Sequence, residues 1–285
     1  MKKLISYLLV AVIAVSLVAV GTACSEEDRL YMATTTSLYD TGLWDYLEPM
    51  FEEEYSVDLD IIYAGTGIAL EYGMRGDVDV ITVHSKSREE QFVADGYGVE
   101  RVPFAYNYFV IVGPADDPAG IEGMTPEDAF TQFFKTGNAS FVSRGDDSGT
   151  HGKEKAIWAS AGYDYNEDIL DSGAWYIEAG SGMGPTLVMA SEKRAYTLSD
   201  MGTFLSYQGD IDLVTIVDKG SVLLNVYSVI ACNPEVNVNV NYEMAENMVD
   251  FLTSNEIQEL IGNYGTDQYG TSLFTPCAGN EPTSQ

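Results

Sequence analysis

The sequence predicts an α/β protein of two lobes joined by two strands, and three observations support this prediction. Short apolar runs alternate with segments of helical periodicity, which is the pattern of parallel strands connected by right-handed helical crossovers. Two apolar runs, at 102–113 and 222–232, are too long for the short strands of such units. Each run follows one α/β unit, so the two strands are expected to cross between the lobes and to leave a hinged cleft.

The expected elements follow from the spacing of apolar residues. In the first unit, strands are expected at 29–33, 57–63 and 78–83, with helices around 43–51, from 65 to 72 and at 86–94. In the second, a helix begins at the Thr-Pro pair of 125–126, and strands are expected at 139–142, 175–178 and 195–198. Helices follow the polar turns at 143–151, 180–186 and 199–200. Two helices, 242–252 and 255–261, return to the first unit before a polar tail.

Length and charge limit the function. The 285 residues suffice for one large domain or two ordinary ones, and 46% of them are hydrophobic. The net charge of −30 disfavours a nucleic-acid partner, because phosphates would be repelled. The acidic residues are spread along the chain, so we expect a solvated acidic surface suited to high salt, where the Debye length shrinks to about 3 Å.

The N-terminus has the features of an export signal. Lys2 and Lys3 precede the uncharged apolar run 4–20, and small residues lead to Cys24. We therefore expect a signal segment at 1–23 and a lipidated Cys24 opening the tether 24–27, with the protein held at the extracytoplasmic face of the cell membrane. The apolar run is also close to the length of an uncleaved membrane anchor.

The segment Thr-Thr-Thr-Ser at 34–37 follows the first expected strand. One hydroxyl is enough to cap the helix that follows, so an ordinary N-cap is one interpretation. Four consecutive hydroxyls exceed that need. The surplus donors favour contact with an acceptor such as a bound anion.

The segment Ser-Arg-Gly-Asp-Asp-Ser-Gly-Thr-His at 143–151 is a second polar turn between a strand and a helix. A capped turn with Asp146 or Asp147 as the cap is the simpler interpretation. However, a helix N-terminus presents free N–H groups and a partial positive charge, and Arg144 adds a guanidinium. The turn therefore favours an oxyanion site.

An enzyme is an alternative from another functional class. Ser148 and His151 suggest a serine hydrolase, but three residues of separation at the start of a helix is a poor arrangement for a nucleophile and its base. The sequence has no Walker-type phosphate loop and no clustered His and Cys metal ligands. For Cys232 and Cys277, a disulfide and two unpaired thiols both remain open.

These residues resemble the substrate-capture proteins of tungstate ABC transporters, which belong to the two-lobed periplasmic-type binding proteins. The resemblance spans nearly the whole mature chain in order. It departs from the family pattern at Ile68 and at Ser85-Lys86. The matching segments are 34–37, 64–67, 96–99, 106–118, 143–151, 182–184, 189–200 and 227–230.

The resemblance implies a class II periplasmic-binding-protein fold with lobes at 28–113 plus 228–285 and at 114–227. It implies a non-enzymatic protein without a cofactor that hands tungstate to a membrane permease and ATPase. Molybdate, sulfate and phosphate remain alternative ligands. The oxyanion contacts that it implies are Thr35, Thr36, Ser37, Thr66, Arg144, Ser148, Gly149 and Thr150.

Overall fold

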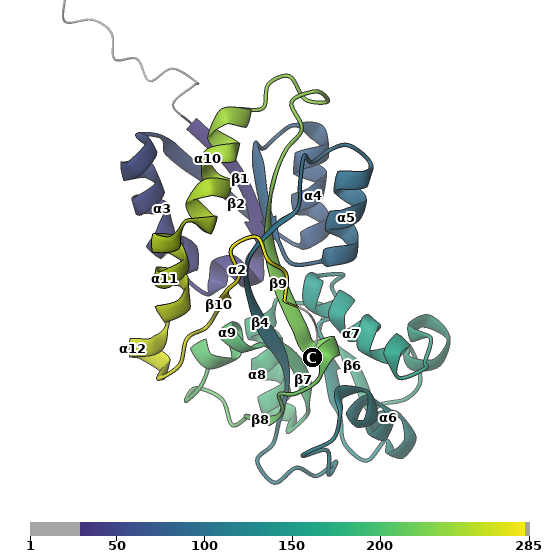
Figure 1. Ribbon diagram of the computed structural model, residues 1–285. Coiled ribbons are helices and arrows are strands. Elements are labelled where there is room, and N and C mark those ends of the chain that lie inside the picture. Colours follow the sequence, from purple (N-terminus) through teal and green to yellow (C-terminus); the bar gives the residue numbers. More distant parts are fainter. Residues whose placement is uncertain (1–28, 283–285) are drawn as a thin grey trace, which may run out of the picture.

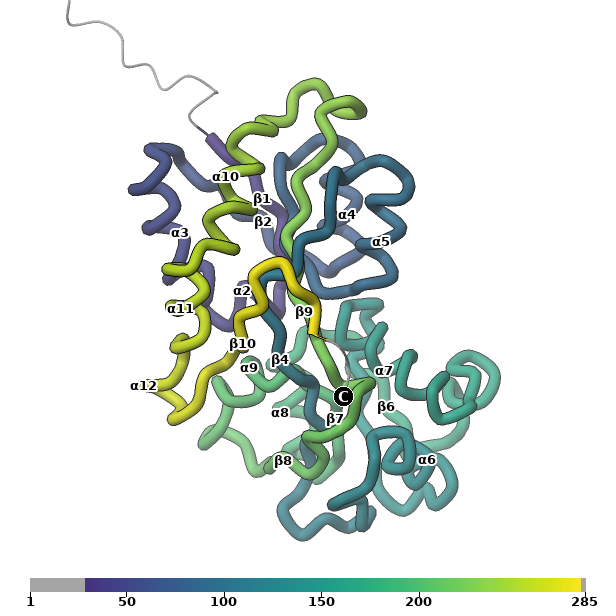
Figure 2. Tube along the Cα trace, viewed as in Figure 1, coloured from purple at the N-terminus to yellow at the C-terminus, as the bar shows by residue number. Residues whose placement is uncertain are grey.

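The computed structural model describes residues 29–282. The expected signal segment 1–23, the expected lipidation site Cys24 and the tether 24–27 lie outside the described residues. Figures 1 and 2 show an upper and a lower group of elements, connected by two long strands near the middle of the molecule. The predicted α/β fold is confirmed.

The upper group is built on parallel strands. β1 (Arg29–Thr35) lies between β2 (Asp58–Ala64) and β3 (Val80–Val83), and both pairings are parallel. The connecting helices begin where each strand ends. These helices are α2 (Thr36–Asp40), α3 (Leu43–Tyr55), α4 (Thr66–Arg75) and α5 (Lys86–Ala94).

Both predicted long strands are present, although the second begins at Leu224 and not at residue 222, because residues 221–223 form a 3-10 turn. β4 (Val102–Gly113) and β9 (Leu224–Ala231) are antiparallel, and β9 also pairs with β3. Up to residue 108, β4 pairs with β9, whereas from 109 onward it pairs with β7 (Thr197–Asp200) and β8 (Val214–Val217). The sheet pairing therefore changes just beyond the paired residues Asn107 and Asn225.

The lower group contains the short parallel pair β5 (Phe141–Ser143) and β6 (Tyr176–Glu178). Its α-helices are α6 (Pro126–Thr136), α7 (Gly149–Ser160), α8 (Met183–Lys193) and α9 (Met201–Ser206). A π-helical turn, η2 (Tyr165–Ile169), and a 3-10 turn, η3 (Ser221–Leu223), complete it, and neither was predicted.

The hydrophobic core is divided in the same way. One set of buried residues, which includes Trp44 and Tyr227, comes almost entirely from the N-terminal part, the start of β4 and the C-terminal part. Another set, around Phe130, Trp158 and Tyr196, comes from residues between 109 and 223. The lobe boundaries 28–113 plus 228–285 and 114–227 stay a prediction.

The C-terminal helices are α10 (Tyr242–Thr253), α11 (Asn255–Asn263) and α12 (Thr266–Tyr269). α10 lies on the upper group beside α3, and α11 and α12 continue downward from it along the same side of the molecule (Figure 1). The polar tail after them is not structureless, since β10 (Thr275–Pro276) pairs with β4. Two residues give no periodicity, so this strand could not be predicted. Cys232 and Cys277 are free thiols, and burial raises the pKa of each.

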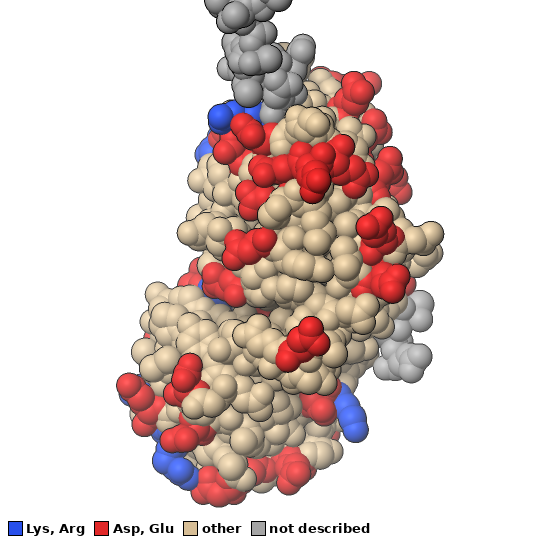
Figure 3. All heavy atoms as spheres, turned by 90° about the vertical axis from the view of Figure 1, so that its left-hand side faces the viewer, with Lys and Arg blue, Asp and Glu red and all other residues tan. Residues whose placement is uncertain are grey.

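Acidic side chains are scattered over the face seen in Figure 3, with few basic ones among them. We expect the midpoint of thermal unfolding to rise between 0.1 and 2 M KCl, because salt screens the mutual repulsion of these carboxylates. Parallel scans in NaCl at equal ionic strength should give the same rise. A midpoint that does not depend on salt would contradict this expectation. No helix within residues 29–282 combines the length and apolar character that crossing a bilayer requires.

Candidate functional site

A pocket of about 290 Å³ lies where the carboxyl ends of strands from both groups meet. Its walls come from five separate stretches of sequence. Hydroxyls, glycines and one guanidinium dominate them. The lining residues are Thr35, Thr36, Ser37, Ala64, Gly65, Thr66, Ile68, His84, Arg144, Asp146, Ser148, Gly149 and Gly182.

Four helices point their N-termini at this pocket. The N-cap residues of α2, α4, α7 and α8 are Thr35, Gly65, Ser148 and Gly182, and all four line it. The hydroxyls of Thr35 and Ser148 each accept a backbone N–H of their own helix, so one hydroxyl of each turn is an N-cap. The prediction of Asp146 or Asp147 as the cap of the second turn was wrong, because α7 begins later and Asp146 accepts the N–H of Ser148 instead. Gly65 and Gly182 make no side-chain cap, which leaves first-turn N–H groups available to a ligand.

Arg144 provides the guanidinium of the pocket although only 7% of the residue is exposed. Its Nη2 contacts the Asp146 carboxylate, while its Nε has no hydrogen-bond partner among residues 29–282. Burial raises the pKa of Asp200 and of Asp40, and the positive charge of Arg144 opposes both shifts. Among residues 29–282, Arg144 is the cation in the wall of this pocket, and the carboxylates of Asp40, Asp146 and Asp200 lie near it.

Seven of the eight residues expected at an oxyanion site line the pocket. The eighth, Thr150, is buried and is not part of the wall. Within residues 29–282, the hydroxyls of Thr66 and Thr150 both lack a hydrogen-bond partner. Direct contact of the eight residues with an anion stays a prediction.

Sequence reasoning did not select His84, Asp146 or Gly182 as site residues, although all of them line the pocket. Gly182 lies in the Gly-rich turn 180–186, whose position before a helix is the same signal that identified 143–151. His84 follows β3 at the start of a polar stretch, Ser85-Lys86-Ser87-Arg88, so nothing local distinguishes it.

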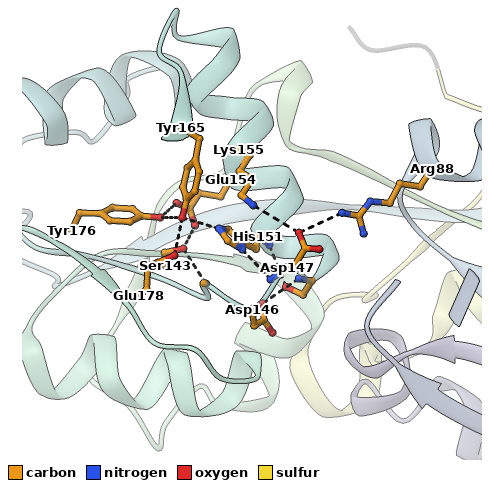
Figure 4. Close-up of polar contacts among 12 residues, drawn as sticks. Arg88, Ser143, Asp146, Asp147, His151, Glu154, Lys155, Tyr165, Tyr176 and Glu178 are labelled. Atoms are coloured by element: carbon orange, nitrogen blue, oxygen red, sulfur yellow. Dashed lines mark hydrogen bonds and ion pairs between the residues drawn. The ribbon is translucent and has the colours of Figure 1, made fainter. Parts of the chain in front are cut away.

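The two groups touch at the start of α7. A Cβ atom on Gly149 would lie 2.9 Å from His84 Cε1 and 3.2 Å from Thr66 Oγ1, both in the upper group. Arg88 of α5 also reaches Asp147 at 3.5 Å (Figure 4). The pocket is thus enclosed between the two groups, and glycine at 149 permits the close approach.

A buried network holds the turn 143–151 in place (Figure 4). Glu154 accepts hydrogen bonds from Ser143 Oγ at 2.5 Å, from Tyr176 OH at 2.7 Å and from Trp158 Nε1 at 3.2 Å. Ser143 Oγ in turn accepts the N–H of Gly145 at 3.2 Å. The backbone beside Arg144 is therefore fixed from the interior of the lower group.

The ring of His151 also supports the turn. Its Nδ1 accepts the backbone N–H of Asp147 at 3.0 Å, so its Nε2 carries the proton and donates to Tyr165 OH at 2.9 Å. Both ring nitrogens are engaged away from the hydroxyl of Ser148. This geometry does not favour the serine hydrolase alternative, because no base is positioned on the hydroxyl.

The buried carboxyl of Glu154 should make the stability of the folded protein depend on pH. Burial raises the pKa of Glu154 from 4.5 to about 7. Between those values the folded protein keeps a proton that the unfolded chain has lost, so stability falls as the pH rises through this window. Glu154→Gln should remove that fall and be more stable than the wild type by about 3 kcal/mol at pH 8, at about 1.36 kcal/mol per pKa unit.

Urea unfolding of both proteins at pH 4.5 and pH 8 measures this difference. Glu192→Gln, at an exposed position of α8, is the matched control and should leave the pH profile unchanged. Parallel pH profiles for wild type and Glu154→Gln would contradict the prediction.

The sequence is similar to those of known binding proteins. Residues 22–256 match the family model described as PBP superfamily domain. The chain is similar to the tungstate-binding protein TupA of Peptoclostridium acidaminophilum, with 42% identity covering 98% of this chain and 99% of that protein.

Two solved structures are also similar. The tungstate-binding protein TupA of Desulfovibrio alaskensis G20 shares 40% identity, with a TM-score of 0.76, covering 87% of this chain and 98% of that one. The tungstate ABC transporter structure from Geobacter sulfurreducens shares 47% identity, with a TM-score of 0.74, covering 84% and 100%.

Proposed function

The chain belongs to the PBP superfamily and, within it, to the tungstate-binding proteins of ABC transporters, and from this premise we infer that it captures tungstate in the pocket described above. It acts as a binding protein and not as an enzyme. We propose that the contacts are made by Thr35, Thr36, Ser37, Thr66, Arg144, Ser148, Gly149 and Thr150.

The convergence of four helix N-termini on one guanidinium is the observation that supports this function most. Free N–H groups and the positive ends of the helices stabilise negative charge at short range. Arg144 adds a full charge where burial excludes water, so its attraction for a dianion is stronger than at the surface. A protein of net charge −30 thus attracts an anion through its local dipoles.

The pocket favours an oxyanion without protons. Asp146 is the lining carboxylate, and its two oxygens already accept from Arg144 Nη2 and from the N–H of Ser148. Asp147 lies outside the pocket wall and pairs with Arg88 and Lys155. A phosphate proton would compete with these donors for the Asp146 oxygens, whereas tungstate, molybdate and sulfate need donors alone.

We propose that the lobes 28–113 plus 228–285 and 114–227 close on the anion by bending of β4 and β9. Closure brings Gly149 against His84 and Thr66 and excludes water from the ligand. We also propose that export and lipidation at Cys24 hold the protein at the extracytoplasmic face of the membrane, where it delivers tungstate to the permease and ATPase.

Calorimetric titration of the purified protein with tungstate, molybdate, sulfate and phosphate tests the proposal. We expect stoichiometric binding of tungstate, with phosphate the weakest of the four. Tight phosphate binding without measurable tungstate binding would refute the assignment. Ester hydrolysis that is lost in Ser148→Ala would instead support the hydrolase.

A further inference from the structure

His84 occupies a position between the pocket and the crossing strands. It follows β3, lines the oxyanion pocket and also lines a neighbouring cavity of about 510 Å³. Its Nε2 lies 3.0 Å from Ser37 Oγ, and its Nδ1 lies 3.0 Å from Asn225 Oδ1. Both contacts are buried. Whether each ring nitrogen carries a proton therefore determines whether its partner accepts or donates the hydrogen bond.

A chain of side chains fixes the direction of these hydrogen bonds. The carbonyl oxygen of Leu273 can only accept a hydrogen bond. The Asn107 atom that faces it at 3.4 Å must therefore be the donor Nδ2. Asn107 Oδ1 then faces β9 and accepts from Asn225 Nδ2 at 2.9 Å. Asn225 Oδ1 is left to face His84, and therefore His84 Nδ1 must carry a proton and donate it.

This direction has a consequence for Ser37. In a neutral imidazole with the proton on Nδ1, Nε2 is an acceptor, so the Ser37 hydroxyl must donate to it. Ser37 then presents lone pairs to the pocket, which repel an oxyanion. If His84 gains a second proton, Nε2–H donates to Ser37 Oγ and releases the hydroxyl proton, which can turn toward the ligand in preference to its long contact with Thr35 Oγ1 at 3.5 Å.

We propose that His84 is a specificity-determining residue that takes up one proton when a dianion enters the pocket, and so converts Ser37 into a donor to that dianion. This inference depends on the proposed oxyanion function. It assigns to His84 a positioning role, because His84 acts on the anion through the hydroxyl of Ser37.

The charges around His84 agree with this coupling. Burial, with smaller contributions from Lys153 and Arg144, lowers the pKa of His84 to about 4 against the opposing hydrogen bond to Asn225, so the empty pocket contains the neutral ring. A dianion beside the ring opposes both effects, since an opposite charge within about 4–6 Å favours the protonated form. The other titratable groups that face the ring or share its cavities are Lys86, Asp146, Tyr227 and Glu281.

Proton uptake can be measured directly. Tungstate is titrated into the full protein at several pH values between 5.5 and 7.5 in buffers of different ionisation enthalpy, and the slope of binding enthalpy against ionisation enthalpy gives the protons bound. We expect uptake to approach one proton per tungstate in the wild type at the lower end of this range. We also expect its affinity to fall by up to tenfold per pH unit as the pH rises above about 4, the pKa of His84 in the empty pocket, and to level off above the pKa of His84 in the complex.

His84→Gln assigns the proton, with Glu192→Gln at an exposed position of α8 as the control. In His84→Gln the introduced side-chain amide donates to Ser37 at any pH, so uptake and the pH dependence of affinity should both disappear. Glu192→Gln should keep both. Tungstate binding by the wild type without proton uptake would overturn this inference alone, and so would uptake that survives in His84→Gln. Absence of tungstate binding would overturn the proposed function itself.

Discussion

Arg144→Ala is expected to weaken tungstate binding by about 2–5 kcal/mol, roughly 30- to 5,000-fold, as when one partner of a buried charge pair is removed. The loss has two physical parts. The dianion loses the full positive charge of the pocket wall. In addition, the Asp146 carboxylate loses its ion-pair partner and remains beside the ligand as an uncompensated negative charge.

Calorimetry on two further variants separates these parts. Arg194→Ala makes the same charge change at a surface ion pair with Asp116, and it should bind tungstate like the wild type. Asp146→Asn keeps an oxygen that can accept the N–H of Ser148, so the double variant Arg144→Ala/Asp146→Asn should recover part of the lost affinity. An Arg144→Ala protein that binds as tightly as Arg194→Ala would exclude Arg144 from the site.

The long strands were the most predictable part of the fold. β4 spans 102–113 as predicted, because a continuous buried apolar run of that length has few other interpretations. The segment 34–37 was less accurately predicted. It was expected to be a single turn, but Thr34 and Thr35 end β1 and Thr36 and Ser37 begin α2. Hydroxyl-rich residues suit both states, so the boundary depends on tertiary packing.

The candidate site was predictable where each turn carried its own signal. A strand followed by Gly, Ser or Thr and then a helix identifies a helix N-terminus that can bind an anion, and this signal singled out the turns that contain Gly65, Ser148 and Gly182. The helix starts were less accurate, since α7 begins at Gly149 and α8 at Met183, inside the turns 143–151 and 180–186 that were expected to precede them. That all these starts meet at one pocket is a property of the sheet topology. The topology follows from pairings between residues far apart in sequence, such as Thr34 with Thr82.

His84 shows where sequence reasoning fails. A single histidine after a buried strand is compatible with a core, a surface or a site. Its role depends on Asn225 and Asn107, which lie on the two crossing strands and meet through their register. Long-range hydrogen bonds of this kind leave no periodicity in the sequence.

Gly149→Ala is expected to weaken tungstate binding by about 1–3 kcal/mol, roughly 5- to 150-fold, which is the usual effect of overpacking. The added methyl would meet His84 Cε1 at 2.9 Å, so the lobes could not reach their closed contact without a shift. The backbone N–H groups of α7 are retained. The loss of affinity would therefore come from obstructed closure and not from a missing donor.

Gly152→Ala is a matched control for this prediction. It lies in the same helix, and apart from its chain neighbours and the adjacent helix backbone no described atom lies within 4 Å of its added Cβ. In the unliganded protein both variants should be as stable as the wild type or more stable by up to about 1 kcal/mol, since alanine favours a helix over glycine. Only Gly149→Ala should lose part of the rise in unfolding temperature that tungstate produces. Equal tungstate-induced rises in the two variants would show that the approach of Gly149 to His84 is not required for binding.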